Sequence, residues 1–225
     1  MEFRSIAIDG PSGAGKSTLA KRCAEALGFL YVDTGAIYRT LGLFAVRCGA
    51  APGDWNAVAP LLDRVSLRWD YGPDGLQHMF LGNEDVTEAI RMPEVSQYAS
   101  AISALPQVRA FLLEMQRDLA RTHNVVMDGR DIGTVVLPGA DVKIFLTASP
   151  EARARRRCAE LAARGTPVDY ATVLADIIAR DERDTTRAAA PLRQAQDAVL
   201  VDTTALDLDQ SLEAILSAVR RKLEP

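Results

Sequence analysis

A short glycine-rich segment near the N-terminus constrains the fold of this chain more than any other feature. The segment reads GPSGAGKS at residues 10–17, after an apolar run at residues 3–8. The pattern of residues 16–27 predicts a helix that ends at Gly28. The spacing Gly-x4-Gly-Lys-Ser between a buried strand and a helix is typical of a phosphate-binding P-loop. We therefore predict a nucleoside triphosphate site at this turn.

The residue types of the loop suit phosphate chemistry. Glycines let the backbone approach a phosphate without a Cβ clash, and successive N–H groups at a helix N-terminus bind its charge. Lys16 is predicted to be catalytic, bringing a positive charge to the transferred phosphate, and the Ser17 hydroxyl suits Mg²⁺. The predicted ATP-binding residues are Gly10, Pro11, Ser12, Gly13, Ala14, Gly15, Lys16, Ser17 and Thr18.

Further apolar runs alternate with helical patterns at both ends of the chain. Strands are expected at residues 29–32, 125–127, 142–146 and 199–201. Helices are expected at residues 36–47 and 208–223, the second capped by Asp207. Strands separated by helices indicate βαβ units, and so an α/β fold with a parallel sheet and helices on both faces.

The middle of the chain has a different pattern. Residues 65–71 and 76–81 alternate between apolar and polar, and the turn sequence GPDG separates them at residues 72–75. This is typical of a β-hairpin, which is foreign to a purely parallel core. Helices are expected at residues 93–104 and 106–121. We interpret residues 54–105 as an insertion with its own small antiparallel sheet.

Two further segments predict anion sites. Asp33 or Thr34 can cap the helix that follows, with Arg39 one turn inside it. The run DGRD at residues 128–131 ends a buried strand, where α/β proteins place ligands. Asp128 is predicted to hold Mg²⁺ directly or through water. The alternative for this run is a turn held by an internal salt bridge.

Arginines gather in one late part of an acidic chain. Nine Arg and no Lys fall between residues 151 and 193, although the net charge is −4. Because guanidinium groups bind phosphate as planar forks, this cluster is a candidate anion site, and Arg157 is predicted to reach the transferred phosphate. Arg153 and Arg156 can share its helical face. The alternative is a solvated helix face with i,i+3 and i,i+4 ion pairs.

Composition excludes other classes of protein. A pI near 5.3 argues against a general nucleic-acid binder, and no apolar run is long enough for a membrane span. Three widely spaced cysteines indicate free thiols in a reducing cytoplasm. A guanine-reading GTPase would carry Asn-Lys-x-Asp, but none of the three asparagines precedes a lysine.

Four motifs taken in order resemble those of the bacterial cytidylate kinases, which phosphorylate CMP and dCMP with ATP. They are DGPSGAGKST, DTGAIYR, DGRDIGTVVLP and RDERDTTRAAAPL, and the resemblance runs over essentially the whole chain. It implies a nucleoside monophosphate kinase fold with a five-stranded parallel sheet and a helical lid. The implied core is about 1–35, 106–150 and 188–225, the acceptor-binding subdomain about 36–105 and the lid about 151–187.

The resemblance also implies roles for individual residues. Thr34, Arg39 and Arg130 would hold the monophosphate, and Arg130 would act in catalysis. Ser100, Arg109 and Asp131 would face the cytosine, and Arg180, Asp184 and Arg187 the sugar and phosphate. A fixed carboxylate at Asp131 would accept from the N4 amino group of cytosine and repel the O4 of uracil.

The expected reaction is therefore transfer of the γ-phosphoryl group of ATP, bound with Mg²⁺, to CMP or dCMP. The expected enzyme is a cytoplasmic monomer that binds neither nucleic acid nor membrane. One alternative is another P-loop small-molecule kinase, with UMP, AMP or shikimate as acceptor. The other is a regulatory P-loop protein that binds ATP without an acceptor.

Overall fold

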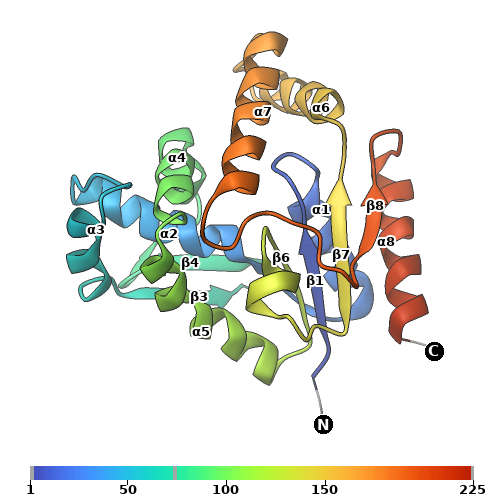
Figure 1. Ribbon diagram of the computed structural model, residues 1–225, viewed down its shortest axis with the longest axis horizontal. Helices are drawn as coiled ribbons and strands as arrows, with labels where there is room; N and C mark the ends of the chain where they lie inside the picture. The colour runs from blue at the N-terminus through green and yellow to red at the C-terminus, as the bar shows by residue number, and fades with distance from the viewer. Residues whose placement is uncertain (1–2, 73–74, 224–225) are drawn as a thin grey trace.

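A parallel sheet of five strands forms the centre of the computed structural model, which describes residues 3–72 and 75–223. Its strands lie in the order β2-β6-β1-β7-β8, and every neighbouring pair is parallel (Figure 1). The bounds are β1 Ser5–Asp9, β2 Leu30–Asp33, β6 Val125–Gly129, β7 Val142–Thr147 and β8 Val199–Asp202. The predicted α/β class is confirmed, with β1 shifted from the expected residues 3–8.

Helices cover both faces of this sheet because the strand side chains alternate between two cores. Ile6 and Ile8 pack on one face against α1 (Lys16–Leu27) and α8 (Leu208–Leu223). Ala7 faces the other core, which includes residues of α5 (Pro106–Thr122) and of the π-helix η2 (Ile132–Val136). The Asp207 carboxylate accepts the N–H of Gln210 at 2.8 Å, as expected of a helix cap.

The turn from β1 into α1 requires glycine at its first position. Gly10 has a φ of +153°, and a Cβ there would lie 1.9 Å from the carbonyl oxygen of Leu146. The turn therefore passes directly against the backbone of β7. This close packing fixes the P-loop at the carboxyl edge of the sheet.

A second group of elements lies beside the sheet (Figure 1), and most of them contribute to a separate hydrophobic core. These are α2 (Thr34–Arg47), α3 (Trp55–Leu62), β3 (Leu67–Tyr71), β4 (Gln77–Leu81), β5 (Glu84–Asp85), η1 (Ala89–Arg91) and α4 (Pro93–Ile102). Strands β3, β4 and β5 form an antiparallel sheet, which confirms the predicted hairpin. Two residues of its predicted turn, 73–74, lie outside the described residues.

Two differences from the predicted elements have local causes. Helix α2 begins at residue 34 rather than 36, because the Asp33 carboxylate accepts the N–H of Ala36 at 2.9 Å and caps the helix. Helix α3 was not predicted; it has only eight residues and contains Pro60. A short segment of this kind carries little periodic signal.

Two helices stand beyond the carboxyl edge of the sheet, within the segment that we predict to be a lid (Figure 1). They are α6 (Pro150–Ala163) and α7 (Tyr170–Thr186), and they pack through Ala154, Val173 and Ile177. An irregular segment then leads from α7 back to β8. Within the described ranges, none of the helices combines the length and apolar character that crossing a bilayer requires.

Candidate active site

A cavity of about 500 Å³ lies at the carboxyl ends of β1, β2 and β6, beneath the lid helices. This is the edge at which parallel sheets place ligands. The predicted residues that line it are Ser12, Gly13, Gly15, Lys16, Ser17, Thr18, Thr34, Arg39, Ser100, Arg109, Asp128, Arg130, Asp131, Arg180, Asp184 and Arg187. Segments separated by up to 175 positions in the chain therefore meet around one space.

The P-loop end of the cavity has a buried carboxylate at its base. Asp128 accepts the hydroxyl of Ser17 at 3.0 Å on Oδ2 and the hydroxyl of Tyr31 at 2.9 Å on Oδ1. Burial, followed by the charge of Asp33, raises the pKa of Asp128 to about 6. Hydroxyl and carboxylate oxygens are hard ligands of the kind that Mg²⁺ prefers. The arrangement fits a magnesium ion that arrives with a nucleotide.

Lys16 places a buried ammonium group beside this carboxylate. Its Nζ donates to the carbonyl oxygen of Pro11 at 2.7 Å. Burial, with the positive charge of Arg130 next, holds the pKa of Lys16 well below its usual range. An anion bound at the loop would offset both effects, since it supplies a negative charge near the ammonium.

A group of guanidinium groups faces the loop across the cavity. Arg130 Nε donates to Asp184 Oδ2 at 2.9 Å. In the described part of the chain, Arg180 Nε and Arg187 Nη2 are buried without a hydrogen-bond partner. Burial, and next the charge of Arg130, lowers the pKa of Arg180 to about 10. Buried donors without acceptors are costly, so their presence in a cavity indicates an anionic ligand.

The start of α2 contributes a further arginine and a buried hydroxyl. Arg39 Nη2 donates to Asp33 Oδ2 at 2.7 Å, so the residue that caps the helix also orients the arginine. The Thr34 hydroxyl donates to the carbonyl oxygen of Asp128 at 2.7 Å. This bond ties the helix start to the end of β6.

The opposite end of the cavity holds a carboxylate between two arginines. The Asp131 carboxylate accepts a hydrogen bond from Arg109 and forms an ion pair with Arg187 at 3.7 Å. The Arg109 guanidinium also lies 5.5 Å from the ring centroid of Tyr38. A rigid carboxylate with flanking cations can distinguish donors from acceptors on the edge of a planar ligand.

Four predicted residues do not line this cavity: Gly10, Pro11, Ala14 and Arg157. Gly10 and Ala14 belong to the buried body of the loop, and Pro11 lines a second cavity on the other side of it. Arg157 donates to Glu160 Oε2 at 2.8 Å on the exposed side of α6. The structure places Arg164, which was not predicted, at the cavity instead.

The arginines of α6 also diverge rather than sharing one face toward the cavity. Arg153 donates to the carbonyl oxygen of Ser12, and Arg156 to that of Thr203. Both contacts join residues far apart in the sequence, so helical spacing alone did not indicate them.

Asp9 is a second residue that the sequence did not single out, and it lies beneath the P-loop rather than on the wall of the cavity. It is buried, and its two carboxylate oxygens accept the N–H groups of Ile132 at 2.8 Å and Gly133 at 2.7 Å. Burial raises the pKa of Asp9 to about 6. The position of Asp9 in the sequence could have indicated its place in the fold. It directly follows an apolar run and precedes Gly10, and residues at the end of a parallel strand lie at the carboxyl edge of the sheet.

Comparison with known proteins gives one consistent family. A family profile described as cytidylate kinase matches residues 6–221. A cytidylate kinase of Carboxydothermus hydrogenoformans is 49% identical over 217 residues, covering 96% of this chain and 97% of the relative. A cytidylate kinase of an Exiguobacterium species is 50% identical over 210 residues, covering 93% of each chain.

A solved structure supports the fold independently of sequence. The crystal structure of an uncharacterized protein from Eubacterium ventriosum superposes with a TM-score of 0.52 at 15% identity. The match covers 95% of this chain and 96% of that protein. At this identity the likeness describes the fold alone.

Proposed function

The chain belongs to the cytidylate kinase family, and we propose that it transfers the γ-phosphoryl group of ATP to CMP and dCMP, releasing ADP and CDP or dCDP. One observation of the structure supports this most directly: Arg180 and Arg187, which in the described part of the chain each have a buried nitrogen without a hydrogen-bond partner, share a cavity with a P-loop. A P-loop by itself accounts only for binding of the donor nucleotide. The guanidinium groups across the cavity from the P-loop can bind a second, anionic substrate.

The donor nucleotide is held at the P-loop. Backbone N–H groups of residues 12–18 and the start of α1 bind its phosphates, and Lys16 neutralises charge on the group in transfer. Ser17 and Asp128 would hold Mg²⁺, which screens the phosphate oxygens when bound. The buried position of Asp128, 3.0 Å from the Ser17 hydroxyl, suits this role.

The acceptor is held by residues from five places in the fold, which are α2, α4, α5, α7 and the end of β6. Arg39 from α2 and Arg130 from the end of β6 bind the monophosphate, and Thr34 supports them from the start of α2. Arg180, Asp184 and Arg187 of the lid bind sugar and phosphate. Ser100, Arg109 and Asp131 read the cytosine, where Asp131 accepts from the N4 amino group.

Catalysis follows from positioning and charge neutralisation. The attacking oxygen of the CMP phosphate is already anionic, so no strong general base is required. Lysine and arginine side chains hold two polyanions in line and offset their repulsion. In this proposal residues 36–105 form the acceptor-binding subdomain.

Residues 151–187 form the lid. Closure of this lid over the cavity excludes water, which would otherwise compete as acceptor. Arg157 approaches the phosphates only on closure.

The measurement that tests the proposal is ADP formation from ATP and Mg²⁺ with CMP, dCMP, UMP, AMP or shikimate in parallel. We expect CMP and dCMP to support turnover far above UMP. Preference for AMP or shikimate would identify another P-loop kinase, and no acceptor-dependent turnover would favour an ATP-binding regulator. That the enzyme acts as a cytoplasmic monomer without nucleic acid or membrane stays a prediction.

A further inference from the structure

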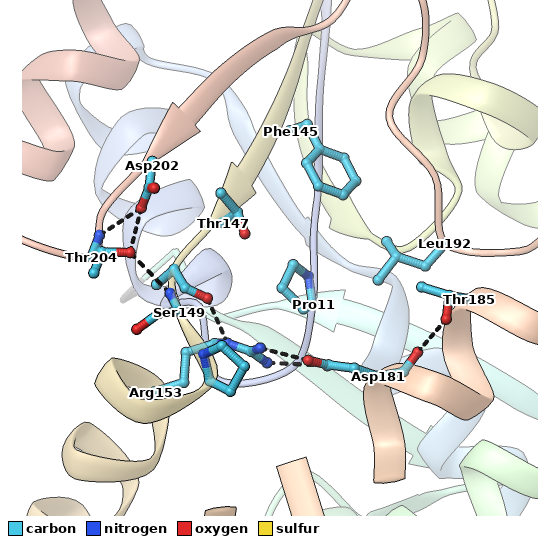
Figure 2. A pocket seen from close by; sticks show the side chains of 12 residues that line it. Pro11, Phe145, Thr147, Ser149, Arg153, Asp181, Thr185, Leu192, Asp202 and Thr204 are labelled. Atoms are coloured by element: carbon cyan, nitrogen blue, oxygen red, sulfur yellow. Dashed lines mark hydrogen bonds and ion pairs between the residues drawn. The ribbon is translucent and has the colours of Figure 1, made fainter. Parts of the chain in front are cut away.

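One buried arginine of the lid contacts the P-loop, the start of its own helix and the second lid helix at once. The side chain of Arg153 is 3% exposed and lies beside the second cavity, of about 390 Å³ (Figure 2). Its Nε donates to the carbonyl oxygen of Ala148 at 2.9 Å, and Nη1 donates to that of Ser12 at 2.9 Å. Both terminal nitrogens also donate to the two carboxylate oxygens of Asp181. Each of the three guanidinium nitrogens of Arg153 therefore donates to at least one protein acceptor.

The contact with the P-loop orients one peptide group. Because C=O and N–H point in opposite directions across a trans peptide, holding the Ser12 carbonyl toward Arg153 turns the N–H of Gly13 away from it. Ser12 and Gly13 both line the active-site cavity. Gly13 packs on Arg153 closely enough that an added Cβ would lie 3.5 Å from the arginine Cβ. Arg153 thus supports the loop from the side opposite the phosphates.

The contact with α7 sets the position of the residues that face the acceptor. Asp181 directly follows Arg180 and lies one turn before Asp184, and both of these neighbours line the active-site cavity. A bidentate arginine–carboxylate pair fixes distance and angle together. The side chains of Arg153 and Asp181 face each other in Figure 2, and we infer that their ion pair fixes α7 relative to the P-loop.

We propose that Arg153 is a positioning residue that couples the P-loop to α7, so that ATP and the acceptor phosphate are held at the correct separation for transfer. This inference rests on the proposed function, because the proposed function places the acceptor next to α7. A positioning role and a purely structural role predict different effects of losing Arg153. Loss of the coupling should slow transfer between bound substrates more than it weakens the binding of either one.

The test compares substitutions at both ends of the ion pair with an exposed arginine on the same helix. Arg153→Lys keeps the charge but lacks the fork, and Asp181→Asn keeps the size but lacks the charge. Arg155→Met serves as the matched control, because Arg155 is exposed and lines neither cavity. The readouts are kcat, KM for ATP and KM for CMP, together with the thermal midpoint of each variant.

We expect Arg153→Lys to lower kcat by about 10-fold to 100-fold while each KM changes by less than about 3-fold. Asp181→Asn should follow in the same direction, and the double variant should lose no more than Arg153→Lys alone. Arg155→Met should match the wild-type enzyme. If Arg153→Lys lowers only the thermal midpoint and keeps kcat, the inference is overturned. A wild-type protein without CMP-dependent turnover overturns instead the proposed function on which it rests.

Discussion

The carboxylate of Asp9 accepts the backbone N–H of Gly133 at 2.7 Å, although 124 positions separate the two residues. The second oxygen of Asp9 accepts the N–H of Ile132 at 2.8 Å. This pair of bonds joins the end of β1, where the P-loop begins, to the segment that follows Asp131. One buried carboxylate therefore ties the P-loop end of the fold to the segment beside Asp131.

The first prediction concerns the pH dependence that Asp9 gives to stability. Burial raises its pKa to about 6 from an ordinary value near 3.8, so folding favours the protonated form. Its contribution to the free energy of unfolding is present at low pH and is lost as pH rises through about 6. We expect the difference in unfolding free energy between wild type and Asp9→Asn to fall by about 2 kcal/mol from pH 4 to pH 7.

Urea unfolding at several pH values measures this difference. The Asp9→Asn protein is itself the control, because all other titrating groups are common to both chains and cancel. If the free energy of unfolding changes with pH in the same way for both proteins, the Asp9 carboxyl has its ordinary pKa in the folded state, which contradicts the prediction.

The second prediction concerns the close backbone approach at Gly10. A methyl group there would lie 1.9 Å from the Leu146 carbonyl oxygen, so either the loop or β7 must move. We expect Gly10→Ala to lower the free energy of unfolding by about 2–4 kcal/mol and to weaken ATP binding. Gly53→Ala is the matched control, since nothing lies within 4 Å of a Cβ at that position. Equal thermal midpoints for the two variants would contradict this account of the turn.

The fold was predictable because its signals are local. Runs such as residues 142–146 are apolar and short, and the hairpin has alternating strands around a glycine-rich turn. The part of the cavity that follows β1, β2 and β6 was predictable for a related reason, since motifs that follow parallel strands must meet at one edge. Neither argument requires knowledge of contacts between distant residues. The residues on or at the ends of helices, by contrast, were expected only from the family resemblance; these are Ser100, Arg109, Arg180, Asp184 and Arg187.

The contacts that were missed all depend on tertiary packing. The bonds of Asp9 with Gly133 and of Arg153 with Ser12 span more than 120 positions. Helix α6 has four arginines within five positions, and the sequence does not reveal which of them is buried. Burial depends on contacts with other elements, such as that of Arg153 with Asp181 and that of Arg156 with Thr203. Arg157 is the member of this set predicted to reach the transferred phosphate on closure, and the structure places it in an exposed pair with Glu160.

The third prediction separates catalysis from stability at Lys16. Its ammonium group is buried beside Arg130, and these surroundings disfavour its charge in the free protein. We expect Lys16→Ala to lower kcat by about 10³-fold or more, because charge neutralisation on the transferred phosphate is lost. The thermal midpoint should not fall, since an unfavourable buried charge is removed. A folded variant that keeps more than a tenth of wild-type kcat would remove Lys16 from the mechanism.

The last prediction concerns the choice between cytosine and uracil. Asp131 is held rigid by Arg109 and Arg187, so its oxygens cannot turn away from a mismatched acceptor. In the proposed binding mode, the N4 amino group of cytosine would satisfy this carboxylate, whereas the O4 of uracil would meet it with a second acceptor. Asp131→Ala should therefore raise KM for CMP while kcat/KM for UMP is unchanged or higher. We expect the ratio of kcat/KM for CMP to that for UMP to fall by about 10²-fold, because the discriminating charge is removed.

The control for this prediction is Ser103→Ala, which alters the same end of the cavity without removing a charge. A ratio that stays at the wild-type value in Asp131→Ala would assign base discrimination to other residues, with Ser100 and Arg109 next to be tested.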